Sequence, residues 1–166
     1  MNKHLYVTLF FLLSALVGLN AQIVNIPDAN FKNALVNTPC AILFGSNGIT
    51  VSPDTNSDGE IQVSEALSVK LLYVAGKSIQ SLEGIEAFSQ LETLESSDNL
   101  LTILNVQGLT SLTSLYCYNN QLMSLNVQGL TSLALLDCYN NQLTSLNVQG
   151  LGNLKSLDCT VNQLTT

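Results

Sequence analysis

Apolar residues recur at a fixed interval through the second half of the chain. Three consecutive segments of 21 residues are near copies of one sequence beginning LNVQGL: 104–124, 125–145 and 146–166. The repeated positions follow the pattern L-x-x-L-x-C-x-x-N-x-L, which the first copy fills with Leu112, Leu115, Cys117, Asn120 and Leu122. Self-similarity at a period near twenty is typical of a solenoid, in which each unit buries its apolar face against the next.

Polar and apolar residues alternate around Leu115–Tyr118, which predicts a short strand with one buried face. Leu115 and Cys117 are expected to point into the core, and Tyr116 and Tyr118 to point outward. The segment from Leu122 to Val127 nearly repeats this pattern, so we expect two short extended segments per coil. Little helix is expected, because the intervening NVQG sequence is a poor helix former.

These positions match the leucine-rich-repeat consensus, and the chain resembles bacterial, internalin-like leucine-rich-repeat proteins. The resemblance implies a right-handed, β-rich solenoid with parallel strands on its concave face and a small N-terminal cap that contains helix. Residues 71–93, and those from 94 to 103 onward, are expected to form earlier, degenerate coils. The stretch GIEAF (84–88) between them is expected to form a helical turn.

Residues 1–21 have the pattern of a secretory signal peptide. Lys3 and His4 precede an apolar run, Leu5–Leu19, and a small residue follows at Ala21. The run is shorter than the roughly 18–20 residues that a spanning helix needs, so we expect no membrane insertion after removal of the signal. The mature protein is therefore predicted to be secreted or displayed at the cell surface.

The net charge of the chain is −7, with 5 lysines, no arginine and 12 acidic residues. This balance disfavours nucleic acid as a partner, because nucleic-acid binding depends on cationic contacts with phosphates.

Residues 22–70 differ in texture from the repeats and are predicted to form the N-terminal cap. IPDANFKNALV (26–36) is expected to form a short helix, with Pro27 and Asp28 at its start. The apolar stretch Cys40–Phe44 is expected to plug the first coil. The opening IPDANF and the passage from SEAL into LEGIEAF resemble caps of secreted leucine-rich-repeat proteins from Bacteroidetes-type bacteria.

A calcium-loop motif lies inside the predicted cap. Residues 54–65 match every position of D-x-[DN]-x-[DN]-G-x₅-E. Calcium binds six to eight oxygen atoms, and this spacing folds enough of them around one point. The expected ligands are Asp54, Asn56, Asp58, the carbonyl of Glu60, Gln62 and Glu65. Because Pro53 and an extended segment precede the loop where an EF-hand has a helix, we expect an isolated, structural site; the alternative is a solvated polar turn.

Two inward columns of the array are predicted to be structural. The asparagines at positions 99, 120, 141 and 162 should bond backbone groups that the turns leave unpaired. Cys117, Cys138 and Cys159 recur every 21 residues and should be buried free thiols, because parallel side chains in register point the same way and suit a disulfide poorly.

The outward columns form the candidate binding surface. Tyrosines interleaved with acidic residues offer large contact area with polar tips, which suits recognition of a protein partner. The predicted concave-face residues are Tyr73, Glu95, Tyr116, Tyr118, Asp137, Tyr139 and Asp158. A carbohydrate-binding surface, or a non-catalytic structural spacer within a larger secreted protein, is the alternative.

The sequence predicts no enzyme. The single histidine, His4, falls in the predicted signal, so a mature histidine-based triad is excluded. Asp137 and Asp158 could mimic a glycosidase pair, but neighbours in one repeat column are a poor basis for that assignment. The last repeat ends at Thr166 without a cap; we expect a fragment of a longer repeat protein or, alternatively, a short protein that dimerises through this end.

Overall fold

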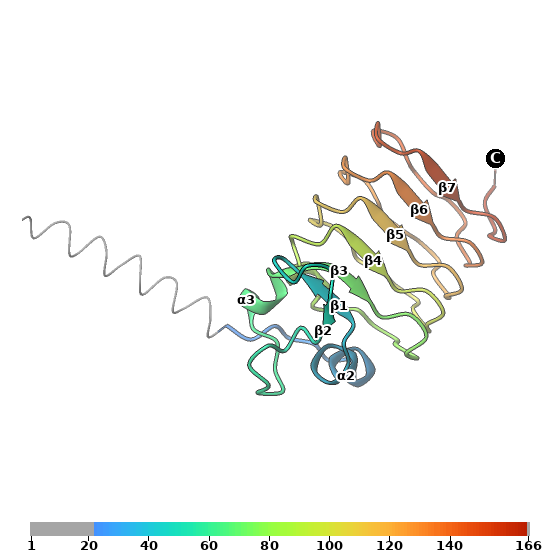
Figure 1. The fold of residues 1–166 in the computed structure, drawn as a ribbon. Coiled ribbons are helices and arrows are strands. Elements are labelled where there is room, and N and C mark those ends of the chain that lie inside the picture. The colour runs from blue at the N-terminus through green and yellow to red at the C-terminus, as the bar shows by residue number, and fades with distance from the viewer. Residues whose placement is uncertain (1–21, 166) are drawn as a thin grey trace, which may run out of the picture.

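The computed structural model describes residues 22–165, and its central feature is a β-solenoid. Five short parallel strands lie side by side along one face of the coil (Figure 1). They are β3 (Val69–Tyr73), β4 (Thr93–Glu95), β5 (Ser114–Tyr116), β6 (Leu135–Asp137) and β7 (Ser156–Asp158). The predicted repeat solenoid with parallel strands and little helix is confirmed.

The register of the strands follows the repeat interval. Leu72, Leu94, Leu115, Leu136 and Leu157 pair across successive strands. Because these leucines occupy one column, a gap of 22 residues between the first two coils and of 21 afterwards keeps each leucine over the one before. From Leu72 to Leu136 they are fully buried, and burial of each such side chain contributes about 1.5–3 kcal/mol.

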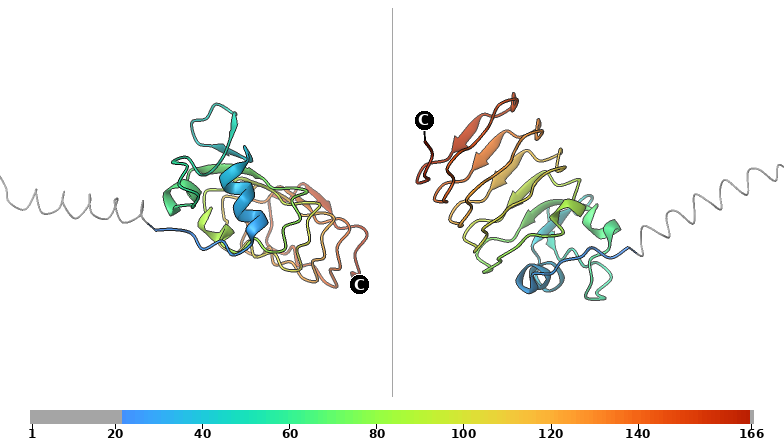
Figure 2. Two further views of the ribbon diagram at one scale, coloured as in Figure 1. Left: turned by 90° about the horizontal axis from the view of Figure 1, so that it is seen from below. Right: turned by 180° about the vertical axis from the view of Figure 1, so that it is seen from behind.

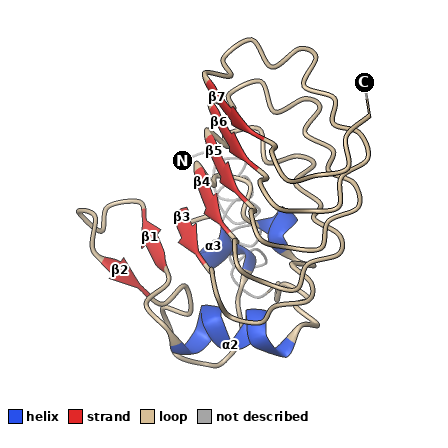
Figure 3. Cartoon of the chain, turned by 90° about the vertical axis from the view of Figure 1, so that its right-hand side faces the viewer, coloured by secondary structure: helices blue, strands red, loops and turns tan. Residues whose placement is uncertain are grey.

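The back of each coil differs from the expectation of a second extended segment. Among the described residues, only one β-bridge, Asn105–Asn126, joins the backs of neighbouring coils, and no back strand forms. Loops cover this side of the solenoid opposite the strands (Figure 3). The side-chain oxygen of Asn105 accepts a hydrogen bond from the Gln107 N–H, so the chain turns immediately after the bridge and a ladder cannot extend.

The cap covers the first coil with one helix and a hairpin (Figure 2). Helix α2 spans Ala29–Asn37 with Asp28 as its N-cap, and it buries Phe31, Ala34 and Leu35, which lie on one face as the spacing predicts. Strands β1 (Ala41–Leu43) and β2 (Thr50–Val51) form the hairpin, and β1 pairs antiparallel with β3. The helix α3 (Val63–Ala66) and the 3-10 turn η1 (Ile85–Ala87) fall where SEAL and GIEAF predict helical turns.

The expectation that Cys40–Phe44 plugs the first coil is only half right. Cys40 and Ala41 are buried, but the Phe44 side chain is 51% exposed. Its ring lies 5.9 Å from the Lys70 ammonium, at the end of a strand that joins the sheet. Since β1 extends the sheet edge, only its inward-facing residues can reach the core.

The predicted signal at residues 1–21 lies outside the described residues. Within the described part of the chain, no helix is long and apolar enough to cross a membrane.

Candidate functional site: the concave face and the cap loop

The outward residues of strands β3 to β7 form the concave face, which is the main candidate surface. The register aligns one residue from each strand in a row: Tyr73, Glu95, Tyr116, Asp137 and Asp158. Neighbouring strands lie about 4.8 Å apart, so these side chains are spaced at the repeat of the sheet. The structure thus brings five of the seven predicted concave-face residues into one row, with Tyr118 and Tyr139 two residues further along their coils.

Each acidic side chain in the row also fixes the turn that follows it. The Glu95 Oε1, Asp137 Oδ1 and Asp158 Oδ1 atoms accept hydrogen bonds from the N–H groups two residues later, at 3.1, 3.2 and 3.0 Å. The second oxygen of each carboxylate accepts no hydrogen bond from residues 22–165. The two ion pairs of this region, Lys32–Glu60 and Lys70–Glu92, include none of the three carboxylates.

For Asp158, the pKa is lowered from its usual value by hydrogen bonds from the hydroxyl and N–H of Thr160, and the carboxylate is fully exposed. The concave face therefore presents fixed negative charge to solvent at neutral pH.

Tyr118 lies in the field of several carboxylates. The charge of Glu95 is the main cause that raises the pKa of Tyr118, and burial and the charges of Asp98 and Asp137 act in the same direction. The nearby Ser97 hydroxyl acts in the opposite direction, although its geometry is not that of a hydrogen bond. These residues come from three consecutive coils, so the middle of the face is a single electrostatic environment.

Ser97 is a feature that the sequence pattern misses. Alternation places it outward, beside Tyr118, yet its side chain is fully buried. Its Oγ atom makes no hydrogen bond, and it is the single buried side-chain polar atom without a partner among the described residues. An unpaired buried hydroxyl costs about 1–3 kcal/mol. The burial depends on side chains of the next coil, which no local pattern reports.

The asparagine column has the predicted structural role. The Asn120 Nδ2 atom donates to the carbonyls of Ser96, Cys117 and Tyr118, and its Oδ1 atom accepts from the Leu101 N–H at 3.0 Å. The asparagines at 99, 141 and 162 make the equivalent bonds to the coil before each. The column therefore joins neighbouring coils and does not face a ligand.

The cysteine column also has the predicted structural form. All four cysteines are free, and Cys117 and Cys138 are fully buried. Desolvation raises the pKa of the Cys138 thiol to about 12 and raises that of Cys117 strongly; the charge of the next thiol along the column adds in each case. Thiols held in their neutral form are poor nucleophiles and poor metal ligands.

The cap loop gathers most of the predicted calcium ligands. The Asp54 Oδ2 atom accepts from the Gly59 N–H at 2.9 Å, and Gly59 adopts a φ of 81°, as the sharp turn requires. The Asp58 Oδ2 atom accepts from the amides of Asn56 at 3.0 Å and Gln62 at 2.8 Å. Asp54, Asn56, Asp58 and Gln62 therefore form one oxygen-rich cluster. The buried Ile61 ties this loop to the core.

Two of the predicted ligands are engaged differently. The Glu60 carboxylate points to the Lys32 ammonium at 2.6 Å, so only its carbonyl is available to the loop. Both oxygens of Glu65 accept backbone hydrogen bonds, Oε1 from Thr55 at 2.8 Å and Oε2 from Gln62 at 3.0 Å. Among the described residues, no three Asp, Glu, His or Cys side chains are grouped so that they alone could hold a metal.

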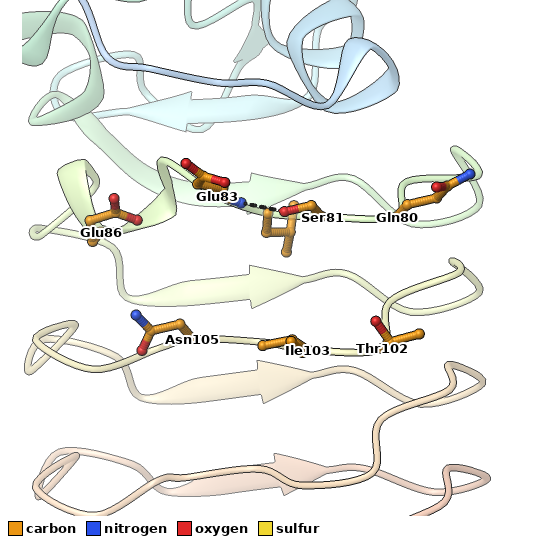
Figure 4. Close-up of a pocket in the computed structure, with 8 residues that line it drawn as sticks. Gln80, Ser81, Glu83, Glu86, Thr102, Ile103 and Asn105 are labelled. Atoms are coloured by element: carbon orange, nitrogen blue, oxygen red, sulfur yellow. Dashed lines mark hydrogen bonds between the residues drawn. The ribbon is translucent and has the colours of Figure 1, made fainter.

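A pocket of about 340 Å³ lies on the back of the first two coils (Figure 4). Gln80, Ser81 and Glu83 line it from one segment, and Thr102 and Ile103 from the next. The Ser81 hydroxyl accepts from the Glu83 N–H at 3.1 Å. The sequence analysis does not identify this pocket, because its lining depends on how two degenerate coils stack.

Known structures share this fold. The functional domain of InlJ from Listeria monocytogenes, which includes a cysteine ladder, matches 87% of this chain with a TM-score of 0.71 and 29% identity. A leucine-rich-repeat protein of Leptospira interrogans matches 63% of the chain with a TM-score of 0.58 and 33% identity. An internalin (InlF) of Listeria monocytogenes matches 85% with a TM-score of 0.59 and 21% identity, and supports the fold alone. The fold is that of a bacterial leucine-rich-repeat solenoid.

This chain spans less than half the length of each of those proteins: 29% of the InlJ domain, 29% of the Leptospira protein and 45% of the internalin. No protein-family model matches the sequence, and no curated protein matches it.

Proposed function

We propose that the protein is a non-catalytic recognition module that binds a protein partner through its concave face, outside the cell or at its surface. The row from Tyr73 to Asp158 is the observation that carries the proposal. Its side chains are exposed or half-buried, and they stand on strands whose backbone hydrogen bonds are made between coils. A surface prepared in this way loses little conformational entropy on binding. The internalin-like neighbours are consistent with such a module.

Tyrosine supplies most of the contact area on this surface. Tyr73 and Tyr139 are each 38% exposed, and Tyr116 and Tyr118 are half-buried. Side chains held partly by their neighbours have few rotamers left to lose, which favours tight contact.

The test compares two variants in affinity capture from extracellular protein mixtures, beside a panel of immobilised polysaccharides. In the first variant, Tyr116, Tyr118 and Tyr139 are all replaced by Ala; in the control, the exposed back residues Ile103 and Met123 are replaced by Ala. We expect a protein that the wild type and the control retain and the tyrosine variant does not. Retention on a polysaccharide instead supports the glycan-binding alternative, and no retention on either favours a structural spacer.

We also propose that the cap loop binds one calcium ion with a structural role. The oxygen-only donor set of Asp54, Asn56, Asp58, the Glu60 carbonyl and Gln62 suits a hard cation. Asn56 and Gln62 already meet at the Asp58 carboxylate, so the amide and carboxylate groups are close together without an ion. Participation of Glu65 requires that the N–H groups of Thr55 and Gln62 release its oxygens.

Calorimetric titration with calcium, and melting with and without chelator, test this site. We expect one ion per chain, a higher melting temperature with calcium, and loss of both effects in Asp58→Ala. Glu60→Gln is the matched control, because its side chain points to Lys32 and it keeps the carbonyl. Equal melting temperatures with calcium and with chelator would exclude the proposal.

A further inference from the structure

The middle of the concave face holds a cluster of three coils' residues whose polar groups lack partners. Glu95 comes from β4, Tyr118 follows β5, and Asp137 ends β6; these strands lie next to one another (Figure 1). One oxygen of each carboxylate accepts a backbone N–H, and the other accepts no hydrogen bond from residues 22–165. No ammonium group within the described chain pairs with either carboxylate.

Ser97 provides a second and independent sign of an unfilled site. Its hydroxyl is fully buried, lies on the same side of the chain as Glu95, and makes no hydrogen bond. Its own N–H donates to Glu95 Oε1 at 3.1 Å, which places the hydroxyl beside the carboxylate. Buried polar groups are paired in the great majority of native structures, so an orphan next to an unpaired carboxylate indicates a donor that the chain does not supply.

Several ligand chemistries fit this cluster poorly. An anionic group, including an acidic glycan, would be repelled by Glu95, Asp98 and Asp137. A divalent cation lacks sufficient ligands, because the described residues contain no group of three metal-ligating side chains of this kind. A neutral sugar would gain nothing from the unpaired charges.

Arginine satisfies all parts of the cluster. Its guanidinium is planar, donates in a forked geometry to a carboxylate, and stacks on an aromatic ring. Resting on the proposed function, we propose that the protein partner inserts an arginine side chain here, which donates to Glu95 and the Ser97 hydroxyl and stacks on the Tyr118 ring. Asp137 adds a second carboxylate one strand beyond Tyr118.

The proposal is tested with a fluorescently labelled arginine-containing peptide and the same peptide with citrulline, a neutral isostere, at each arginine. Fluorescence anisotropy should show the wild type binding the arginine peptide at least tenfold more tightly than the citrulline peptide, about 1.4 kcal/mol. The double variant Glu95→Gln/Asp137→Asn should lose that preference, and Ser97→Ala should weaken it by a smaller factor.

A matched control separates a specific site from the general attraction of a protein with net charge −7. The double variant Glu83→Gln/Glu86→Gln removes the same charge from the back pocket and should bind the arginine peptide as the wild type does. Equal binding of the two peptides, or equal loss in both double variants, would overturn the proposal. If Glu95→Gln/Asp137→Asn still captures the protein partner that the tyrosine variant loses, the arginine site is wrong and the recognition module stands.

Discussion

In the regular coils each buried asparagine repeats the hydrogen bonds of the asparagine one coil earlier, whereas the cap is attached through contacts that occur only once. The Asp28 carboxylate is the clearest of these single contacts. Its Oδ1 atom caps helix α2 through the N–H groups of Asn30 and Phe31, both at 2.9 Å. Its Oδ2 atom accepts from Gln80 at 2.8 Å and Ser81 at 3.0 Å, in the first coil.

The difference has consequences for stability. In a solenoid, each coil contacts mainly its neighbours, so a lost asparagine weakens two interfaces that other columns still support. The Asp28 carboxylate acts at two places at once, and no equivalent residue supports the junction of cap and coil. We expect the array to be disrupted most by the loss of a buried amide, and the cap by the loss of one exposed carboxylate.

Replacement of Asn120 by Ala should have the largest effect. It leaves the Leu101 N–H and buried carbonyls such as that of Cys117 without partners, each costing about 1–3 kcal/mol. Chemical denaturation should therefore show a loss of roughly 3 kcal/mol or more. Asn126→Ala is the control, because its exposed side chain accepts a single local bond from Gln128. Comparable losses in the two variants would contradict the assigned role of the column.

Replacement of Asp28 by Ala should cost about 2 kcal/mol, since capping and charge-assisted hydrogen bonds are lost together. Burial acts to raise the pKa of Asp28, but the N–H groups of Phe31, Gln80, Ser81 and Asn30 lower it overall. Because the folded-state pKa lies below the unfolded value, this stabilisation is complete above the unfolded pKa and is lost as the pH falls through the folded one. Denaturation between pH 6 and the acid range should show a weaker pH dependence in Asp28→Asn than in the wild type.

The cysteine column predicts a loss of stability at alkaline pH. Burial raises the pKa of Cys138 from 9.0 to about 12, so the unfolded thiol ionises first. Stability is then complete below pH 9 and falls by up to about 1.4 kcal/mol per pH unit for this group as the pH rises toward 12. Denaturation of wild type and Cys138→Ala at pH 8 and pH 10 tests this. Equal slopes in the two proteins would show that the thiol does not contribute.

Val161 should be improved by substitution. It occupies the left-handed position that Asp98, Asn119 and Asn140 hold in earlier coils, with a φ of 55°, and its side chain is 59% exposed. This conformation costs a β-branched residue about 1–2 kcal/mol, and asparagine tolerates it better.

We expect Val161→Asn to stabilise the protein by about 1 kcal/mol in the same denaturation assay. The new amide could also continue the chain in which Asn119 donates to Asp98 at 2.8 Å and Asn140 donates to Asn119 at 2.9 Å. Val161→Thr, which keeps the branched side chain, should change little.

Residue spacing alone predicts much of this molecule. The 21-residue interval implies parallel strands in register, because only a constant coil length returns each leucine to the same column. The buried face of α2 and the asparagine column were predicted for the same reason, since each depends on contacts within one repeat or one helix. The calcium loop and the partner surface stay predictions from the sequence pattern, with positions that the structure now specifies.

The remaining features depend on contacts between coils, which residue spacing does not encode. The back of the coil carries a single bridge because the Asn105 side chain turns the backbone, and Phe44 stays exposed because β1 lies at the sheet edge. Ser97 has the outward position that alternation assigns, yet the folded chain buries it beside Glu95 and Tyr118 without a hydrogen-bond partner. The sequence by itself determined which side of the chain each residue faces; only the stacking of neighbouring coils decided which of those residues reach solvent, because a side chain is covered by its spatial neighbours.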